Sequence, residues 1–203
     1  MSDHYIETLD QLRQLYPPPG PRAVAKQLPR LDRHCRRFIE LSPFVVLSTG
    51  SGEGFDASPR GGAAGFVRVV DEATLWIPDS PGNHRLDSLA NIVASGAAGL
   101  LFLIPGVDET LRVNGSAQLC SDPEKLRQFA SEIRTPKVII EISAREVFLH
   151  CAKALMRSKL WSDEVRQPRS VLPTMGQMLA EQTGQEAPAE TQEQMVARYQ
   201  RDL

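Results

Sequence analysis

The sequence predicts a mainly β fold, in which about five or six mostly antiparallel strands close into a small barrel and helices are inserted between and beside them. Two observations carry this prediction. Between residues 44 and 149, short runs rich in Val, Ile, Leu and Phe recur, separated by turns that contain Gly, Pro or Asp. On either side of this region, apolar residues recur at helical spacing instead. With 203 residues, the chain fits a single domain that can bury a core.

Helical segments precede the strands. Residues 3–15 are expected to form a short amphipathic helix with Asp3 as a candidate N-cap, and the proline-rich run 16–21 ends it. Residues 22–41 are expected to be helical again, with an interruption near Pro29.

The central region then changes to strand-like runs, which cover residues 44–49, 65–70, 74–78, 99–104 and 110–119. The stretch 137–149 supplies one or two further strands. Residues 50–54 form a glycine-rich turn, and residues 71–72 join two strands in a hairpin. The run 99–104 is apolar throughout and is expected to be buried on both faces, whereas Gly115 marks a bulge or a close backbone approach.

Further helices are expected between and after these strands, over residues 85–95, 122–133 and 151–159, and in one or two amphipathic segments after Pro168 and Pro173.

Composition limits the classes of partner and the compartment. The formal net charge of −2 argues against broad attraction to nucleic acid or to a membrane surface. The three cysteines are widely spaced and form neither a disulfide framework nor a metal-binding pattern, so no metal site is expected. The first residues do not resemble a signal sequence, and no apolar run is long enough to span a bilayer. A cytoplasmic protein is the expectation.

The segment from Asn83 to Asn91 is the first candidate site. It joins a strand to a helix, and Arg85, Ser88 and Asn91 follow one another at intervals of three residues. A guanidinium, a hydroxyl and the free N–H groups of a helix start could together hold a phosphate. The alternative is that Asn83 only caps the helix while Arg85 is solvated, and the two interpretations are about equally supported.

A second basic segment, Ser58-Pro-Arg-Gly-Gly62, lies upstream at the edge of a strand. Its glycines would let the main chain approach a ligand beside Arg60. Alone, the segment is better explained as an ordinary glycine-rich turn. Together with the first segment, it favours an anion site.

Arg112 and Asn114 share one face of the strand 110–119. That face could line a cleft at a dimer interface, or it could simply face solvent.

Cationic and aromatic residues gather between His150 and Trp161, among them Lys153, Arg157 and Ser158. They could form a wall around a planar anionic ligand, with Trp161 stacking on it. The alternative is a surface helix with Cys151 packed inward. A Cys–His nucleophile lacks an orienting third group, and a metal would need more ligands than His150 and Cys151.

Taken in order, these segments resemble the FMN-binding branch of the pyridoxamine 5′-phosphate oxidase-like flavoproteins. The resemblance covers about residues 40–162 and rests on the following runs: Asp56-Ala-Ser-Pro-Arg-Gly61, Ile77-Pro-Asp-Ser-Pro-Gly-Asn-His-Arg-Leu-Asp-Ser-Leu-Ala-Asn-Ile92, Leu101-Phe-Leu-Ile-Pro-Gly106, Glu109-Thr-Leu-Arg-Val-Asn-Gly115 and His150-Cys-Ala-Lys-Ala154, followed by Arg157-Ser158 and Leu160-Trp161.

The resemblance implies a split β-barrel with six antiparallel strands in Greek-key order, and a homodimer that holds FMN between its protomers. It assigns the phosphate and ribityl chain to Arg60, Asn83, Arg85 and Ser88. It also implies that a second group lies near the flavin or completes the cleft from the partner chain, namely Arg112, Asn114, Lys153, Arg157, Ser158 and Trp161.

The function expected from this resemblance is that of an FMN-dependent oxidoreductase with an unidentified small-molecule substrate and an electron donor such as NAD(P)H. Oxidation of vitamin B6 is disfavoured, because the substrate-binding arginine and histidine pattern of the true oxidases is not evident near the C-terminus. The alternative is a non-catalytic protein that binds or senses flavin or haem, since no catalytic pair is visible.

Overall fold

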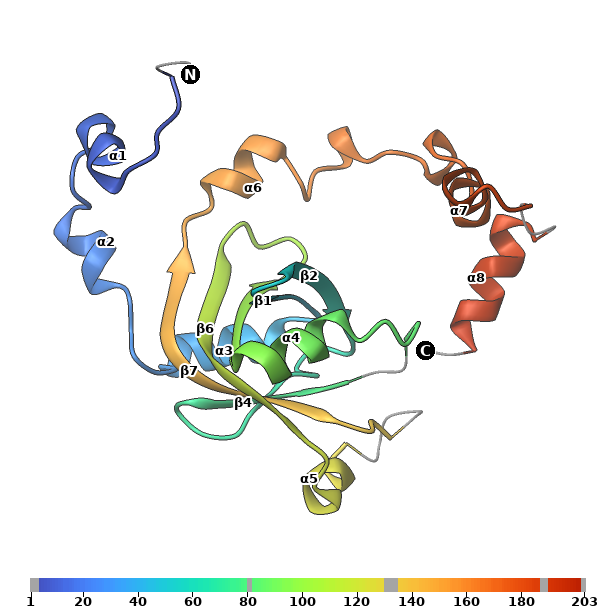
Figure 1. Ribbon diagram of the computed structural model, residues 1–203, viewed down its shortest axis with the longest axis horizontal. Coiled ribbons are helices and arrows are strands. Elements are labelled where there is room, and N and C mark those ends of the chain that lie inside the picture. Colours follow the sequence, from blue (N-terminus) through green and yellow to red (C-terminus); the bar gives the residue numbers. More distant parts are fainter. Residues whose placement is uncertain (1–3, 80–81, 130–134, 187–189, 202–203) are drawn as a thin grey trace.

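The structure is a computed structural model that describes residues 4–79, 82–129, 135–186 and 190–201. Its centre is one antiparallel sheet that curls into a barrel (Figure 1), with the strand order β2-β1-β5-β6-β7-β4-β3. The strands are β1 (Phe44–Ser51), β2 (Gly54–Gly61), β3 (Arg68–Val69), β4 (Thr74–Pro78), β5 (Ala97–Leu103), β6 (Thr110–Cys120) and β7 (Ile139–His150).

The mainly β split barrel is therefore confirmed, but with seven strands instead of six. The additional strand is β2, since residues 58–62 were expected to form a turn. The chain reverses tightly after Ser51, and β2 pairs with β1 from Ser51↔Gly54 to Phe44↔Gly61. The sequence pattern did not indicate β2, because this strand has no apolar face that packs in the core. Backbone pairing with β1 forms it instead, at the edge of the sheet. The two edge strands, β2 and β3, form no ladder with each other in the described residues. The sheet therefore curls into a barrel without the hydrogen-bonded closure that was predicted.

The helices are α1 (Leu9–Leu15), α2 (Pro21–Ala25), α3 (Arg33–Leu41), α4 (Asp87–Ser95), α5 (Pro123–Arg127), α6 (Lys153–Ser158), α7 (Met175–Thr183) and α8 (Gln192–Gln200). Two 3-10 turns, Asp163–Val165 and Arg169–Val171, link α6 to α7.

Several expected helix boundaries were wrong. The first helix begins at Leu9, where Thr8 caps it in a capping box, and Asp3 lies outside the described residues. The interruption expected near Pro29 is confirmed, but it is wider than a single break: α2 ends at Ala25 and α3 begins at Arg33, because the chain at Leu28 pairs with Val147 of β7. The helix after Asp122 ends at Arg127, so it is shorter than expected; residues 130–134 lie outside the described part.

The core lies inside the barrel, where α3 closes one side and α4 packs on β1, β2 and β6. β5 is fully buried on one face only, through Ala98, Leu100 and Phe102; its other face is half-buried, so the expected burial on both faces was wrong. The bulge at Gly115 is confirmed by a register shift between Asn114 and Gly115. A Cβ at Gly115 would lie 2.0 Å from the carbonyl oxygen of Ser143, which explains why glycine is needed there.

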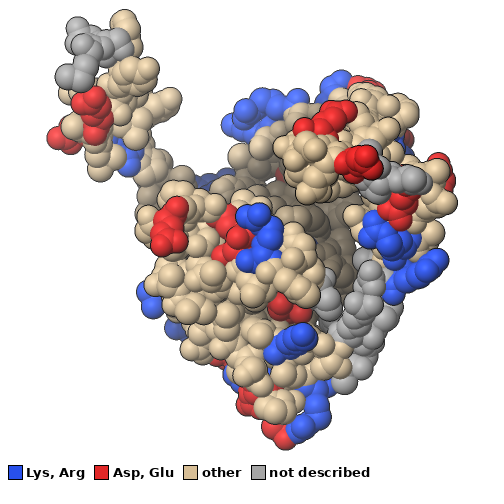
Figure 2. Space-filling model, turned by 45° about the vertical axis from the view of Figure 1, so that its right-hand side comes forward, with Lys and Arg blue, Asp and Glu red and all other residues tan. Residues whose placement is uncertain are grey.

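The N- and C-terminal segments extend around the barrel (Figure 1). From residue 152 to 201, Ala180 is the one buried residue in the described part of the chain. The space-filling view shows positive and negative side chains interspersed on the visible face (Figure 2). Among the described residues, no helix has the length and apolar character needed to cross a membrane.

Candidate functional site

A cavity of about 1110 Å³ opens between β2 and the segment that leads from β4 into α4. Strand β2 contributes Ser58 to Gly61 to its wall, and residues 82–89 form the facing wall. Lys137 and Val138, just before β7, also line it. The two segments with Arg60 and Arg85 therefore meet at one cavity, as the sequence predicted.

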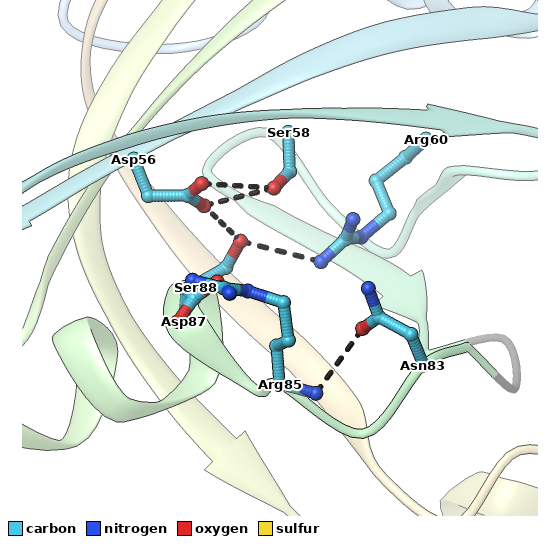
Figure 3. Close-up of polar contacts among 7 residues, drawn as sticks. All are labelled: Asp56, Ser58, Arg60, Asn83, Arg85, Asp87 and Ser88. Atoms are coloured by element: carbon cyan, nitrogen blue, oxygen red, sulfur yellow. Dashed lines mark hydrogen bonds and ion pairs between the residues drawn. The ribbon is translucent and has the colours of Figure 1, made fainter. Parts of the chain in front are cut away.

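Three polar side chains of β2 point toward α4, because they occupy alternate positions of the strand (Figure 3). Asp56 accepts hydrogen bonds from the hydroxyl of Ser58, at 2.9 Å and 3.1 Å, and from the hydroxyl of Ser88. Ser88, buried in the first turn of α4, in turn accepts a hydrogen bond of 3.3 Å from Nη2 of Arg60. Arg60, Ser88 and Asp56 thus form a continuous chain of polar contacts.

The guanidinium of Arg60 is only partly satisfied. Its Nη1 donates to the carbonyl oxygen of Pro59, at 3.2 Å. Its Nε is buried and has no hydrogen-bond partner among the residues that the structure describes. A buried donor without a partner is costly, so this atom is a site where a ligand oxygen would be stabilised.

Arg85 is arranged differently from the prediction. Helix α4 begins at Asp87, so Arg85 precedes the helix, and Asn83 does not cap it. Asn83 instead accepts a hydrogen bond of 3.1 Å from the backbone N–H of Arg85. The side chain of Arg85 is 72% exposed and pairs with Asp87 through Nε, at 2.7 Å, a bond that raises the pKa of Arg85.

The backbone explains why the helix starts late. His84 and Leu86 both have φ of 62°, in the left-handed region. Two left-handed residues within three positions cannot belong to an α-helix. The strained segment turns Ser88 toward β2 (Figure 3), and Arg85 lines the cavity with a mostly exposed side chain.

Asp79, at the end of β4, adds a carboxyl group to the cavity wall. Burial raises the pKa of Asp79, and the nearby charge of Arg60 partly opposes this shift. The cavity therefore combines cationic groups with a carboxyl group that gains a proton more readily than an exposed aspartate.

The second group of predicted residues lies elsewhere on the sheet. Arg112 and Asn114 do share one face of β6, with Leu111 and Val113 buried on the other. Both contact Glu146 of β7: Arg112 through an ion pair, and Asn114 through a hydrogen bond of 3.1 Å. This face is half-buried, so it does not simply face solvent. Neither Arg112 nor Asn114 is among the described residues that line the cavity beside Arg60.

The predicted residues near the end of the strands also lie outside that cavity. Lys153, Arg157 and Ser158 belong to α6, and the hydroxyl of Ser158 donates to the carbonyl oxygen of Leu155. Trp161 donates from Nε1 to the carbonyl oxygen of Val107, at 2.9 Å. Within one chain, none of these residues is among the described residues that line the cavity.

Three acidic residues were missed in the sequence analysis: Asp56 and Glu146, which hold the two clusters together, and Asp79, which lines the cavity. For Asp56 a signal was present, since Asp56, Ser58 and Arg60 alternate as they would along a strand. Glu146 could not be placed, because its contact with Asn114 depends on the bulge at Gly115.

Comparisons with known proteins agree with this fold. The chain matches the family model described as pyridoxamine 5′-phosphate oxidase over residues 31–151. A search of curated proteins finds no match to the chain.

Among solved structures, a variant of HupZ from Group A Streptococcus is similar with a TM-score of 0.50 and 14% identity, and the match covers 59% of this chain and 99% of that one. A Lactobacillus delbrueckii protein provisionally named a pyridoxamine 5′-phosphate oxidase gives a TM-score of 0.48 and 19% identity, over 61% of this chain and 98% of that one.

The family model covers more than half of the 203 residues, and it includes every strand of the barrel. The chain therefore belongs to the pyridoxamine 5′-phosphate oxidase family.

Proposed function

We propose that this protein is an FMN-binding flavoprotein that acts as an oxidoreductase on a small molecule. The observation that carries the proposal is the buried Nε of Arg60, which has no partner among the described residues and belongs to a side chain that lines a cavity of about 1110 Å³. This volume lies slightly above the usual range for small-molecule sites, so the cavity has room for a ligand as large as FMN.

Arg60 fits the phosphate of FMN better than Arg85 does. A guanidinium can offer two parallel N–H donors to a phosphate, and its bonds to an anion are stronger in a partly buried site. Arg60 is half-buried, whereas Arg85 is mostly exposed and already paired with Asp87. Arg60 is therefore the main phosphate residue in this proposal, and Arg85 a secondary one.

Ser88 has a different role from a direct phosphate donor. Its single hydroxyl proton is donated to Asp56, while its oxygen accepts from Arg60. Ser88 therefore holds the guanidinium of Arg60 in place, and Asp56 holds Ser88. Asn83 supports the backbone of the facing segment through its bond to the N–H of Arg85.

When bound, FMN supplies the hydride or electron transfer, and the protein supplies orientation and hydrogen bonds. We further propose that two copies form a homodimer in which Arg112, Asn114, Lys153, Arg157, Ser158 and Trp161 of one chain complete the cavity of the other. NAD(P)H serves as the electron donor. The three free cysteines suit the reducing cytoplasm as the place of action.

Titration with FMN and with riboflavin tests the proposal, since the two differ only in the phosphate. We expect wild-type protein to quench FMN fluorescence at micromolar concentration and to bind riboflavin more weakly. Arg60→Ala should weaken FMN binding by about 10- to 150-fold, the range that charged hydrogen bonds give, and leave riboflavin binding unchanged.

Arg37→Ala is the matched control, because Arg37 is an exposed arginine on α3 that pairs with Glu40. A colourless protein that quenches neither flavin contradicts the proposal. Equal losses of FMN and riboflavin binding in Arg60→Ala would show that Arg60 does not bind the phosphate. Anaerobic reduction of the loaded protein by NADH or NADPH, followed by turnover with organic acceptors, separates an enzyme from a protein that only binds or senses its ligand.

A further inference from the structure

A second cavity, of about 560 Å³, lies between α2 and the end of β7. Its walls come from two places far apart in the sequence: residues 20–23 with Lys26, and residues 149–151. It shares no lining residue with the cavity beside Arg60. None of the proposed flavin residues lines it either.

The charge of this second cavity is one-sided. Arg22, Lys26 and His150 line it, and no carboxylate does among the residues that the structure describes. Glu146, on the same strand as His150, is already engaged by Arg112, Asn114 and Gln27.

Two of these three basic side chains are fixed in place. Nζ of Lys26 donates to the carbonyl oxygen of Leu149 at 3.0 Å and lies 4.7 Å from the ring centre of Phe148. The ring of His150 packs against the same Phe148, with the ring centres 4.6 Å apart. Phe148 thereby holds Lys26 and His150 close to each other, at the cavity wall.

The remaining wall is apolar and small. Pro21, Ala23 and Leu149 line it, and the volume exceeds what an inorganic ion needs. The site therefore fits an oxyanion that is attached to a small apolar body.

We propose that this second cavity binds a small organic anion, with its phosphate or carboxylate group at Lys26, His150 and Arg22 and its apolar part against Leu149 and Pro21. The proposal is independent of flavin binding. It gives a role to His150, which the proposed flavin site does not use.

The electrostatics of His150 provide a direct readout. Burial lowers the pKa of His150, and the charges of Arg112 and Lys26 lower it further. Arg22 and Cys151 also line the cavity beside it, and Glu146 lies four residues before it on β7. An anion bound beside the imidazole would favour its charged form, so the pKa of His150 should rise on binding.

NMR titration of the four histidines tests this in the FMN-saturated protein. His150 reports on the second cavity, His84 on the flavin cavity, and the exposed His4 and His34 serve as references. A His150→Asn variant assigns the signal. Phenyl phosphate and benzoate are the probes, and benzyl alcohol is the uncharged control.

We expect phenyl phosphate or benzoate to raise the titration midpoint of His150 by about one pH unit, which corresponds by linkage to about tenfold tighter binding by the charged imidazole. The midpoints of His84, His4 and His34 should not move, and benzyl alcohol should have no effect. The probe with the larger shift identifies the anionic group that the cavity prefers.

Lys26→Gln and Arg22→Ala should each weaken binding of the probe by about five- to tenfold, whereas Arg13→Ala on α1 should leave the affinity for the probe unchanged. Arg22→Ala keeps both contacts of Lys26, so it reports on binding even if Lys26→Gln disturbs the N-terminal segment. The proposal fails if the midpoint of His150 is the same with and without about 10 mM of either probe, a concentration that would reveal even weak binding. It also fails if His84 shifts in place of His150. Neither result bears on FMN binding, which the fluorescence titration measures separately.

Discussion

Arg60 of β2 and Ser88 of α4 are joined by a hydrogen bond of 3.3 Å from the guanidinium to the hydroxyl oxygen, although 28 residues separate them in the chain. The hydroxyl of Ser88 in turn donates a hydrogen bond to Asp56. Asp56 lies on the same face of β2 as Arg60, four positions earlier. The contact therefore couples the strand to the helix across the wall of the cavity. It also fixes the direction of a guanidinium whose Nε is left unpaired within the described structure.

This arrangement predicts that Ser88 acts through Arg60. Ser88→Ala should weaken FMN binding by about three- to tenfold, the cost of losing one hydrogen bond that orients a charged group. In an Arg60→Ala background the same substitution should have almost no further effect. A double-mutant cycle of FMN dissociation constants measures the coupling. Additive losses would show that Ser88 contacts the phosphate directly.

Arg85 should matter less than Arg60. Its side chain is 72% exposed and its Nε is engaged by Asp87, so solvent and the carboxylate both reduce what it offers an anion. Arg85→Ala should weaken FMN binding by less than about threefold, while Asp87→Asn, which releases Arg85, should strengthen it slightly. Fluorescence titration at low salt checks both. A larger loss in Arg85→Ala than in Arg60→Ala would reverse the assignment.

Gly115→Ala should be strongly destabilising. An added Cβ would lie 2.0 Å from the carbonyl oxygen of Ser143 and 3.1 Å from Cα of Ala144, so the β6–β7 ladder would have to move. Because the obstacle is backbone, we expect a loss of about 3 kcal/mol or more, at the upper end of overpacking effects. Urea unfolding measures it. Gly52→Ala is the control, since no atom lies within 4 Å of its Cβ position.

Residue patterns predicted the apolar strands and the bulge at Gly115, because apolar runs and an isolated strand glycine both have a direct physical cause. They missed β2, whose Asp56, Ser58 and Arg60 form a polar edge strand that backbone pairing with β1 stabilises. They also placed Arg85 inside a helix. Side-chain periodicity does not report a left-handed backbone at His84 and Leu86, so the late helix start could not be foreseen.

The site was predicted to a similar degree. Arg60, Asn83, Arg85 and Ser88 do meet at one cavity, because the two segments that carry them flank it. The partners that orient them were missed, since Asp56 contacts Ser88 across 32 residues and only the folded sheet brings the two together.

Leu86→Asn should stabilise the protein. Leu86 has φ of 62°, is 54% exposed and makes no side-chain cap bond at the start of α4. Asn tolerates the left-handed region better than Leu and is also a favoured N-cap residue, so we expect a gain of about 1 kcal/mol. Leu86→Ala removes the same apolar surface without these advantages and should give no gain. Thermal unfolding of the two variants tests this prediction. Equal Tm values would contradict the idea that the left-handed backbone at Leu86 costs stability.

Glu141 should make stability depend on pH on the acid side. Lys125 lowers the pKa of Glu141 through a side-chain bond, and Gln118 and the indole N–H of Trp76 lower it further, against the effect of burial. A carboxyl whose folded pKa lies below its unfolded value of 4.5 stabilises the fold above that pH and loses this contribution as the pH falls through the folded pKa. Glu141→Gln should therefore lower Tm most at about pH 7, and the difference from wild type should shrink steadily toward about pH 3.

Glu40→Gln, in an exposed pair with Arg37, should show almost no difference at either pH. A Glu141→Gln effect that stays constant from neutral to acid pH would mean that packing of the side chain, and not its charge, stabilises this part of the sheet.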